Sequence, residues 1–272
     1  MKYHDDADEA SQACGSGNFL RKLDEYYAHY YRDALGLPDW QERCRLRRDE
    51  VDVIGEKVLR PLESVHNIQL SGARCLVVGC GSGAELGALL RRSSEVYGVE
   101  PDVDGVELSR MRAVQGGQAF DVAATRIVQG VSEHLPWEDA FFDVVICHTV
   151  LEHVSDIRRS VQEMIRVCRK GGRVFFHLPD YRFPWEGHYK MWLPTFLPRQ
   201  MLNVYLELKG RPSDFLRTIN FATAPQLDRI FAEIGVAYSR FVPHSAMPKQ
   251  RLLAWYCWLL NLTPHQYIVL YP

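Results

Sequence analysis

Three glycines follow the apolar run 75–78 at a spacing that could form a nucleoside-binding loop. Gly79, Gly81 and Gly83 come after this run, and a helical pattern begins after them. Glycine allows a sharp turn and leaves no side chain between the main chain and a ligand. Glu100 ends the next apolar run, 95–100, where its carboxylate can accept hydrogen bonds from both hydroxyls of a ribose. Together these residues predict a nucleoside pocket with close backbone contact.

The glycine loop does not by itself say which nucleoside is bound. Gly79, Gly81 and Ala84 also satisfy the G-x-G-x-x-G/A spacing of dinucleotide-binding proteins, and Glu100 lies where that pattern places its acid. An NAD-dependent dehydrogenase is therefore an alternative. It predicts a six-stranded sheet that is parallel throughout, whereas this chain is expected to end in an antiparallel strand over 266–271.

The motifs that follow distinguish between these alternatives. Residues 128–137 read VQGVSEHLPW, residues 142–154 read FDVVICHTVLEHV, and residues 169–180 read RKGGRVFFHLPD. With the glycine loop and Glu100, this succession resembles the class I S-adenosylmethionine-dependent methyltransferases over roughly residues 73–180. The resemblance implies an α/β, Rossmann-like fold with a seven-stranded sheet, parallel except for one antiparallel strand and flanked by helices. It also implies S-adenosyl-L-methionine as cofactor.

The same resemblance assigns candidate cofactor contacts. The adenine would lie against residues 131–133, but the family commonly has Asp directly after this glycine, where the chain has Val131. Contacts to the base then fall to the backbone of Val131 or Ser132, or to the side chains of Ser132 or Glu133. His148, at the end of the fourth expected strand, would face the amino-acid end of the cofactor. Cys80 is expected to be a small wall residue rather than a nucleophile. The full set of predicted contacts is Gly79, Cys80, Gly81, Gly83, Glu100, Pro101, Val131, Ser132, Glu133 and His148.

His153, in the sequence Leu-Glu-His-Val, is the candidate catalytic base. In some sugar and small-molecule O-methyltransferases that resemble this pattern, a histidine here deprotonates the acceptor hydroxyl, and an imidazole titrates near neutrality. The same histidine could instead brace the turn at a helix start, so both roles stay open. His177, Tyr181 and His188 are candidate substrate-binding residues, with an aromatic loop packed on its own core as the alternative.

These residues predict a methyltransferase acting on a small-molecule or glycan acceptor, with oxygen as the expected acceptor atom. A non-catalytic subunit that keeps the fold is the remaining alternative. No metal site is expected, because the ten histidines form no H-x-x-x-H pair and no cluster with cysteine at ligand spacing. A net charge of −2 lacks the basic footprint of nucleic-acid binding, so no nucleic-acid partner is expected, although a homodimer is possible.

The 272-residue chain is long enough for one large domain with additions. Seven cysteines without a C-x-x-C pair predict reduced thiols and a cytoplasmic protein. Residues 1–17 are acidic and polar, without a secretory signal, and are predicted to be disordered. A helical cap over 18–70 precedes the methyltransferase domain over 71–272, in which the insertion 181–220 and a helix over 249–262 form lid or substrate elements. The apolar part of that helix favours packing on the sheet or on a second subunit over contact with a membrane surface, and it is too short to cross a bilayer.

Alternating apolar runs and helical patterns place the core elements. Strands are expected near 73–78, 95–99, 124–129, 142–147, 173–177, 236–242 and 266–271, and helices near 83–92, 103–114, 155–168, 201–209 and 223–234. Ahead of them, two helices are expected over 19–35 and from Asp39 to about residue 66. The proline-rich aromatic segment 181–199 is expected to be a folded loop.

Overall fold

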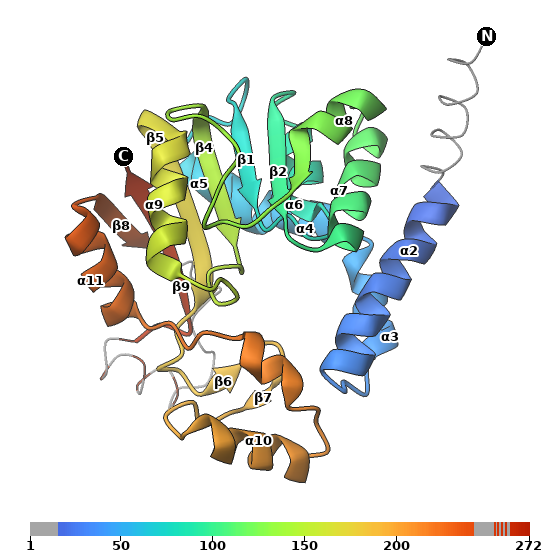
Figure 1. Cartoon of the computed structure of the whole chain (residues 1–272), viewed down its shortest axis with the longest axis vertical. Helices are drawn as coiled ribbons and strands as arrows, with labels where there is room; N and C mark the ends of the chain where they lie inside the picture. The colour runs from blue at the N-terminus through green and yellow to red at the C-terminus, as the bar shows by residue number, and fades with distance from the viewer. Residues whose placement is uncertain (1–15, 242–252, 254, 256, 258, 260–261) are drawn as a thin grey trace.

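A seven-stranded sheet forms the centre of the protein (Figure 1). The computed structural model describes residues 16–241, 253, 255, 257, 259 and 262–272. Strands β1 to β5 run parallel, and β9 lies antiparallel between β5 and β8, in the order β3-β2-β1-β4-β5-β9-β8. The α/β fold class and its antiparallel strand are therefore confirmed, and the all-parallel sheet of the dehydrogenase alternative is absent among the described strands. The strands are β1 (Cys75–Val78), β2 (Val96–Glu100), β3 (Ile127–Gln129), β4 (Phe142–His148), β5 (Cys168–Pro179), β8 (Ala237–Phe241) and β9 (His265–Tyr271).

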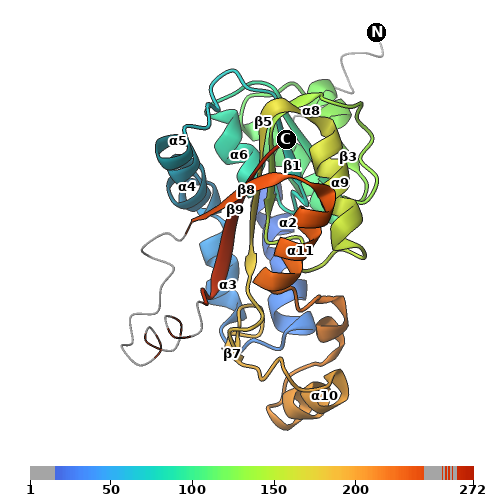
Figure 2. The same ribbon diagram turned by 90° about the vertical axis from the view of Figure 1, so that its left-hand side faces the viewer.

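Helices cover both faces of the sheet, and the strand sequences explain why. In β1 all four residues are buried: Cys75 and Val77 pack into one apolar core, whereas Leu76 and Val78 pack into the other. Such continuous apolar strands are typical of a parallel sheet covered on both sides. On one face lie α4 (Glu50–Ile54), α5 (Arg60–His66), α6 (Ala84–Leu90) and α7 (Val103–Gln115), and on the other α9 (Ile157–Val167) and α11 (Ala224–Ile234) (Figure 2).

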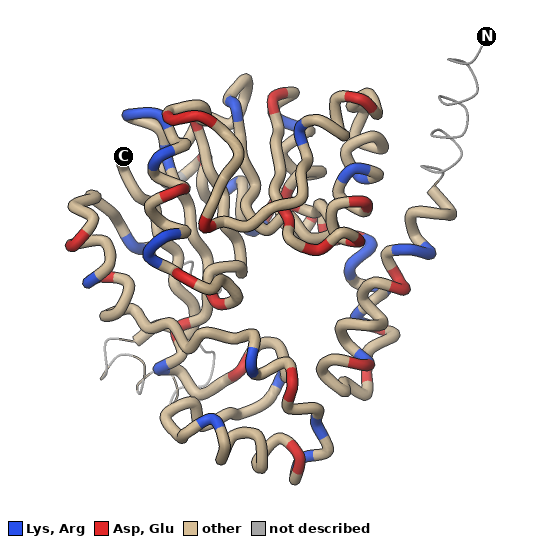
Figure 3. The backbone as a smooth tube through the Cα atoms, in the orientation of Figure 1, with Lys and Arg blue, Asp and Glu red and all other residues tan. Residues whose placement is uncertain are grey.

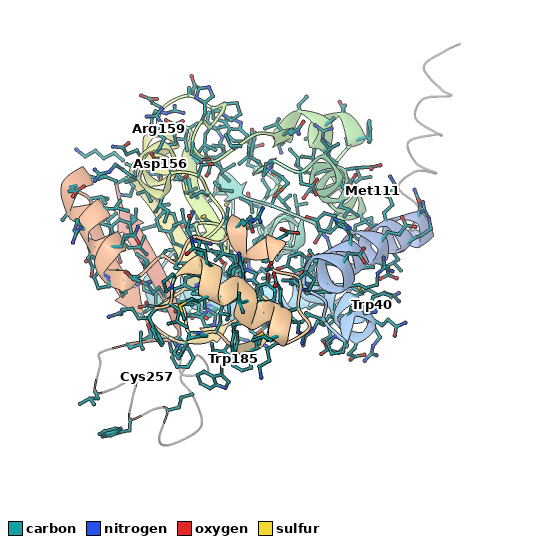
Figure 4. The ribbon with its side chains drawn as sticks, turned by 60° about the horizontal axis from the view of Figure 1, so that its bottom comes forward. Trp40, Met111, Asp156, Arg159, Trp185 and Cys257 are labelled. Carbon is teal, nitrogen blue, oxygen red and sulfur yellow. The ribbon has the colours of Figure 1, made fainter. Side chains whose placement is uncertain are left out.

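The N-terminal cap consists of short helices rather than the two expected ones. The helix expected over 19–35 comprises α2 (Ser16–Ala28) and a π-helical turn, η1 (His29–Ala34), so Ser16 and Gly17 are helical rather than disordered. The helix expected over 39–66 divides at residues 48–49 into α3 (Trp40–Arg47) and α4. Helix α4 continues through the π-helical η2 (Gly55–Leu59) into α5. Asp39 precedes α3 but pairs with Arg43 instead of capping the helix. Trp40 and Met111 mark the side of the molecule where the cap lies against α7 (Figure 4).

The inserted segment 181–220, which we call the lid after its position, lies beyond the carboxyl ends of the parallel strands (Figure 1). It contains a small hairpin, β6 (Trp185–Glu186) and β7 (Met191–Trp192), then α10 (Arg199–Leu208) and the 3₁₀-helix η3 (Asp214–Thr218). Trp185 projects from the lid away from the sheet (Figure 4). One apolar cluster joins lid and cap, since Tyr189 and Leu202 pack with Leu23 and Leu35. The lid and the cap therefore enclose the same edge of the sheet.

Three further expectations differ from the structure or lie outside it. Residues 120–126 form a helix, α8 (Phe120–Arg126), where a strand was expected to begin at residue 124. Strand β5 begins at Cys168 instead of 173, with a register shift opposite residues 142–144. Most of the predicted helix 249–262, like residues 1–15, lies outside the described residues.

None of the described helices is long and apolar enough to cross a bilayer. Acidic and basic residues are both spread over the described chain (Figure 3).

Candidate active site

The glycine loop between β1 and α6 has the backbone that its sequence predicts. Gly79, Gly81 and Gly83 have φ values of +68°, +49° and +80°, in the left-handed region that glycine adopts without strain. A Cβ at Gly79 would lie 2.7 Å from Val150 Cγ1, whereas a Cβ at Gly81 would meet nothing within 4 Å. Gly79 is thus required by packing against the turn after β4. The backbone at Gly81 faces open space that a ligand could fill.

Glu100 lies at the end of β2, beside this loop, and is 8% exposed. The backbone N–H of Gly81 donates to its Oε2 at 2.8 Å, and the N–H of Asp102 donates to Oε1 at 3.1 Å. Burial raises the pKa of Glu100, and these two hydrogen bonds oppose that shift. Each carboxylate oxygen keeps lone pairs for a further donor. Glu100 therefore shapes the loop and can still accept hydrogen bonds from a ligand.

Two cavities adjoin at Gly79 and Val150, and both residues line each of them. The first has a volume of about 270 Å³ and is mainly apolar, with Val99, Pro101 and Val131 among its walls. The second, of about 360 Å³, is lined by polar and aromatic side chains from the loop, the cap and the end of β4. A ligand that spans both would combine an apolar ring with a polar end. The lining of the second cavity includes Tyr26, Tyr27, Tyr30, Arg47, Cys80, Gly81, Glu85, His148 and Thr149.

Two of the predicted adenine contacts have side chains that bind the protein itself. Ser132 is 6% exposed, and its hydroxyl lies 2.8 Å from Ser160 Oγ. Glu133 Oε1 accepts a hydrogen bond from the backbone N–H of Ser155 at 2.7 Å, just before α9. Both residues line the 270 Å³ cavity, but their polar atoms hold the turn before α9 in place. The backbone beside Val131 is left to meet a base.

Opposite charges face each other in the 360 Å³ cavity. Arg47, from the cap, pairs with Glu50, donates to Tyr31 Oη at 2.6 Å and lies over the ring of Tyr27. Glu85, in the first turn of α6, lies 2.8 Å from His148 Nδ1. Burial alone would raise the pKa of Glu85, but the hydrogen bond and charge of His148 hold it below its usual value. The cavity therefore offers a cation and an anion to a zwitterionic group.

A third cavity, of about 230 Å³, lies between the turn after β4 and the lid. It shares Tyr30, Arg47 and Thr149 with the 360 Å³ cavity, so the two adjoin. Thr149 has a φ of +57°, which is strained for a β-branched residue, and its N–H donates to His177 O at 2.7 Å. The lining further includes Glu152, His153, Pro179, His188, Lys190 and His265.

His153 is held by hydrogen bonds at both ring nitrogens. Its Nδ1 lies 3.2 Å from the carbonyl oxygen of Thr218, and its Nε2 lies 3.2 Å from His188 Nε2. His188 Nδ1 in turn lies 2.5 Å from Glu186 Oε1 in the lid hairpin. Although part of the His153 ring is exposed, desolvation, followed by repulsion from His188, lowers its pKa to about 4. His153 and His188, predicted from different motifs, thus come together.

Glu152 was not singled out from the sequence, although it precedes His153. It is completely buried, and neither carboxylate oxygen has a hydrogen-bond partner among the described residues. Burial raises the pKa of this carboxyl group to about 7, against the opposing effect of His188. Burying an unpaired carboxylate is costly, and proteins rarely leave a buried polar group without a partner.

The other predicted substrate residues lie behind the cavity walls. His177, 8% exposed, is stacked between the rings of His148 and His265, with centroids 4.6 and 5.1 Å away. Burial lowers the pKa of His177 well below its usual value. Tyr181 packs in the apolar cluster of cap and lid. Tyr26, Tyr27 and Arg47 line the 360 Å³ cavity with the glycine loop, and no spacing in the sequence revealed this position.

Glu152, His153 and His188 also form a possible donor set for a metal ion, since their ligand atoms lie within 4.8 Å of one another. No sequence spacing indicated this group, because His188 comes from the lid. The hydrogen bonds of both imidazoles are satisfied within the described protein, so a proton between the rings accounts for the geometry equally well.

Residues 76–176 match the family model for a methyltransferase domain. Among curated proteins, the chain is 29% identical over 135 residues to a ubiquinone biosynthesis O-methyltransferase of Pectobacterium carotovorum, covering 46% of this chain and 54% of that protein. It is 34% identical over 107 residues to the protein of that name from Cronobacter sakazakii, covering 39% and 42%. The chain thus spans about half the length of the curated relatives it matches.

Solved structures share the fold at low sequence identity. An S-adenosylmethionine-dependent methyltransferase from Mesorhizobium loti matches with a TM-score of 0.53 and 16% identity, covering 82% of this chain and all of that one. A geranyl diphosphate methyltransferase in complex with S-adenosylmethionine matches with a TM-score of 0.51 and 16% identity, covering 96% and 93%. These matches concern the fold.

Proposed function

We propose that this chain transfers a methyl group from S-adenosylmethionine to a hydroxyl of a small-molecule or glycan acceptor. The match of residues 76–176 to a methyltransferase-domain family model supports this proposal. The bound cofactor would supply an electrophilic methyl carbon on a sulfonium. The protein's part is mainly to align the groups, an effect that can contribute about 7–11 kcal/mol. The observation that carries the proposal is a row of three adjoining cavities, two of which are lined by Gly79 of the glycine loop and the third by the turn after β4 and the lid.

The residues present fit the cofactor. The apolar 270 Å³ cavity suits adenine, with the backbone near Val131 meeting the base. Glu100 does not line this cavity, but it is bonded to Gly81 and would accept the ribose hydroxyls with its remaining lone pairs. The 360 Å³ cavity suits the zwitterionic amino-acid end, since Arg47 can meet the carboxylate and Glu85 the ammonium. Open space beside Gly81 allows the close backbone approach that the predicted contacts require.

The acceptor would occupy the 230 Å³ cavity under the lid. This cavity adjoins the 360 Å³ cavity at Thr149, where we place the methyl group of the cofactor, and it contains the predicted residues His153 and His188. A larger hollow of about 580 Å³ between α2, α7 and η3 shares Tyr30 with it and leaves room for the rest of a large acceptor. The curated relatives with O-methyltransferase names support oxygen as the acceptor atom.

The cofactor part of the proposal is tested by calorimetry with S-adenosylmethionine and S-adenosylhomocysteine. Glu100→Gln is expected to weaken binding by about 1–3 kcal/mol, through loss of charge-assisted hydrogen bonds. Asp104→Asn removes the same charge from an exposed position in the first turn of α7 and serves as the control. Equal affinities for the wild type and Glu100→Gln would contradict the ribose assignment. No binding by the wild type would favour a non-catalytic subunit.

The acceptor part is tested by screening phenols, catechols and sugars for formation of S-adenosylhomocysteine. The expected result is turnover with hydroxyl acceptors and none with their O-methylated analogues. Turnover with amines alone would refute O-methylation but leave the methyltransferase proposal standing.

A further inference from the structure

The hydrogen bonds around His153 fix where the protons of this site lie. The Thr218 carbonyl oxygen can only accept, so His153 Nδ1 carries a hydrogen. The carboxylate of Glu186 likewise accepts from His188 Nδ1. Burial would raise the pKa of Glu186, but the hydrogen bond and charge of His188 hold it below its usual value, in agreement with an ionised carboxylate.

One further proton must then lie between the two rings. His153 Nε2 and His188 Nε2 face each other at 3.2 Å, and two bare lone pairs at that distance would repel. The single proton between them makes the pair an imidazole and an imidazolium, with Glu186 as counter-ion. The low pKa of His153 places the charge on His188. His153 therefore uses its remaining lone pair to accept from His188 and is not free to act as a base.

Glu152 is the acidic group of the acceptor cavity that remains available. It lines the cavity from the turn after β4, its side chain is completely buried, and both oxygens lack a partner in the described part of the chain. Its position is fixed by the backbone, since its carbonyl oxygen accepts from the N–H of Asn220 at 2.6 Å. Titratable and charged groups surround it from β4, the turn after β4, β9, the cap and the lid: Cys147, His148, His153, His265, Tyr30, Tyr31, Arg47, Tyr181, Glu186, His188 and Lys190.

We infer that Glu152, and not His153, takes the proton of the acceptor hydroxyl, an inference that rests on the proposed methyl transfer. The acceptor O–H bond breaks and its proton passes to a carboxylate oxygen of Glu152. The acceptor oxygen forms a bond to the methyl carbon, and the bond from that carbon to sulfur breaks with its electron pair going to sulfur. Glu152 ends the step neutral and releases the proton to water before the next turnover.

The environment of Glu152 suits this task. A general base works best when its pKa lies near the working pH, and the pKa of Glu152 is raised to about 7 by its burial. The His188 imidazolium and Glu186 form a pair of opposite charges in the lid. Because His188 pairs with Glu186, neither residue provides a hydrogen-bond partner to the carboxylate of Glu152.

The experiment compares Glu152→Gln with His153→Gln, using Glu56→Gln on the surface of the cap as the control. With a hydroxyl acceptor from the screen, Glu152→Gln is expected to lower kcat about 100-fold or more, as removal of a general base does, and to abolish the acid limb of the pH profile. His153→Gln is expected to keep that limb. Loss of the limb in His153→Gln but not in Glu152→Gln would overturn the inference.

A second readout does not depend on the natural acceptor. 4-Nitrophenol absorbs visible light as its phenolate, so its ionisation on binding to the protein with S-adenosylhomocysteine reports a proton acceptor in the cavity. The wild type and His153→Gln are expected to bind the phenolate at a pH below the probe's own pKa, and Glu152→Gln the neutral phenol. Absence of ionisation in the wild type would count against Glu152 as the base.

Two controls distinguish proton transfer to Glu152 from a failure of the proposed function and from metal binding. S-adenosylmethionine binding is measured for every variant: if the wild type binds it and Glu152→Gln turns over normally, the inference fails while the proposed function stands. If a chelator abolishes turnover and one divalent cation restores it, Glu152 holds a metal ion and the inference is overturned. Turnover that withstands the chelator supports proton transfer to the carboxylate.

Discussion

Replacing Glu152 by Gln is expected to make the protein more stable at pH 8 and to leave its stability near pH 4 unchanged. Glu152 is completely buried without a partner among the described residues, and its pKa is raised from 4.5 to about 7. The folded state therefore holds its proton over a range in which the unfolded chain has released it. Gln has nearly the same shape and carries no charge at any pH.

The sign of the stability change with pH follows from the direction in which the pKa of Glu152 is shifted. A raised folded-state pKa gives a contribution to stability that is complete below the unfolded value, and this contribution is lost as the pH rises through about 7. At about 1.4 kcal/mol for each pKa unit, the difference between 4.5 and 7 corresponds to about 3 kcal/mol of destabilisation by the ionised carboxylate. For a protein of this size that is on the order of 5–10 °C in Tm.

Glu186 provides a matched comparison, because its replacement by Gln should change the stability in the opposite direction. It is 1% exposed and lies in the same site, but its pKa is lowered by His188 despite its burial. Its contribution to stability is present above its unfolded pKa and is lost as the pH falls. Glu186→Gln should therefore lower the stability at pH 8, where Glu152→Gln raises it.

The assay is thermal and urea unfolding of the three proteins without ligand between pH 4 and pH 8. The expected difference between Glu152→Gln and the wild type grows between about pH 4.5 and pH 7 and is constant above pH 7. A difference that does not change with pH, or a destabilised Glu152→Gln at pH 8, would refute the assignment of an unpaired buried carboxylate.

Three further predictions concern the cofactor side of the site. Gly79→Ala should lower Tm and abolish S-adenosylmethionine binding, because the new Cβ would overlap Val150. Gly210→Ala is the control, since Gly210 has a nearly equal φ of +67° and a Cβ there would meet nothing within 4 Å, so it should cost only about 1 kcal/mol of backbone strain. Equal effects of the two substitutions would contradict the packing argument. Arg112→Lys should lower Tm by removing the Nε hydrogen bond to Ser82 O and the contact over Phe19, and thermal unfolding that matches the wild type would refute that role. His148→Asn should weaken S-adenosylmethionine binding by raising the pKa of Glu85, and calorimetry should show the loss growing as the pH falls.

The parallel core could be predicted from the sequence because local patterns determine it. Strand β1 is apolar at every position, and β2, β3 and β5 each follow a helical pattern, which predicts that they run parallel. The prediction failed where local signals were ambiguous. Residues 120–126 are too short for clear periodicity, and the start of β5 at Cys168 depends on an irregular pairing around Gly171 and Gly172.

The acceptor side could be predicted only in part, because its geometry depends on contacts between distant segments. His153 and His188 were both singled out, but nothing in their separation of 35 residues indicates that their rings meet. Tyr27 and Arg47 have the spacing of ordinary helix residues, and only the packing of the cap turns them toward the glycine loop. Such long-range contacts leave no periodic signal in a single sequence.

Glu100 and Glu152 show how the same residue type can be used in two ways. Both are buried beside the ends of parallel strands, but each oxygen of Glu100 accepts a backbone hydrogen bond, and those of Glu152 accept none from the described residues. The first arrangement stabilises a charge before any ligand arrives, and therefore suits a fixed contact to ribose. The second leaves the charge unstabilised, so its proton affinity is high and its partner must come from the ligand. A folded protein retains such an unpaired acid at a loss of stability, and a role in proton transfer accounts for its being tolerated at the entrance to the methyl position.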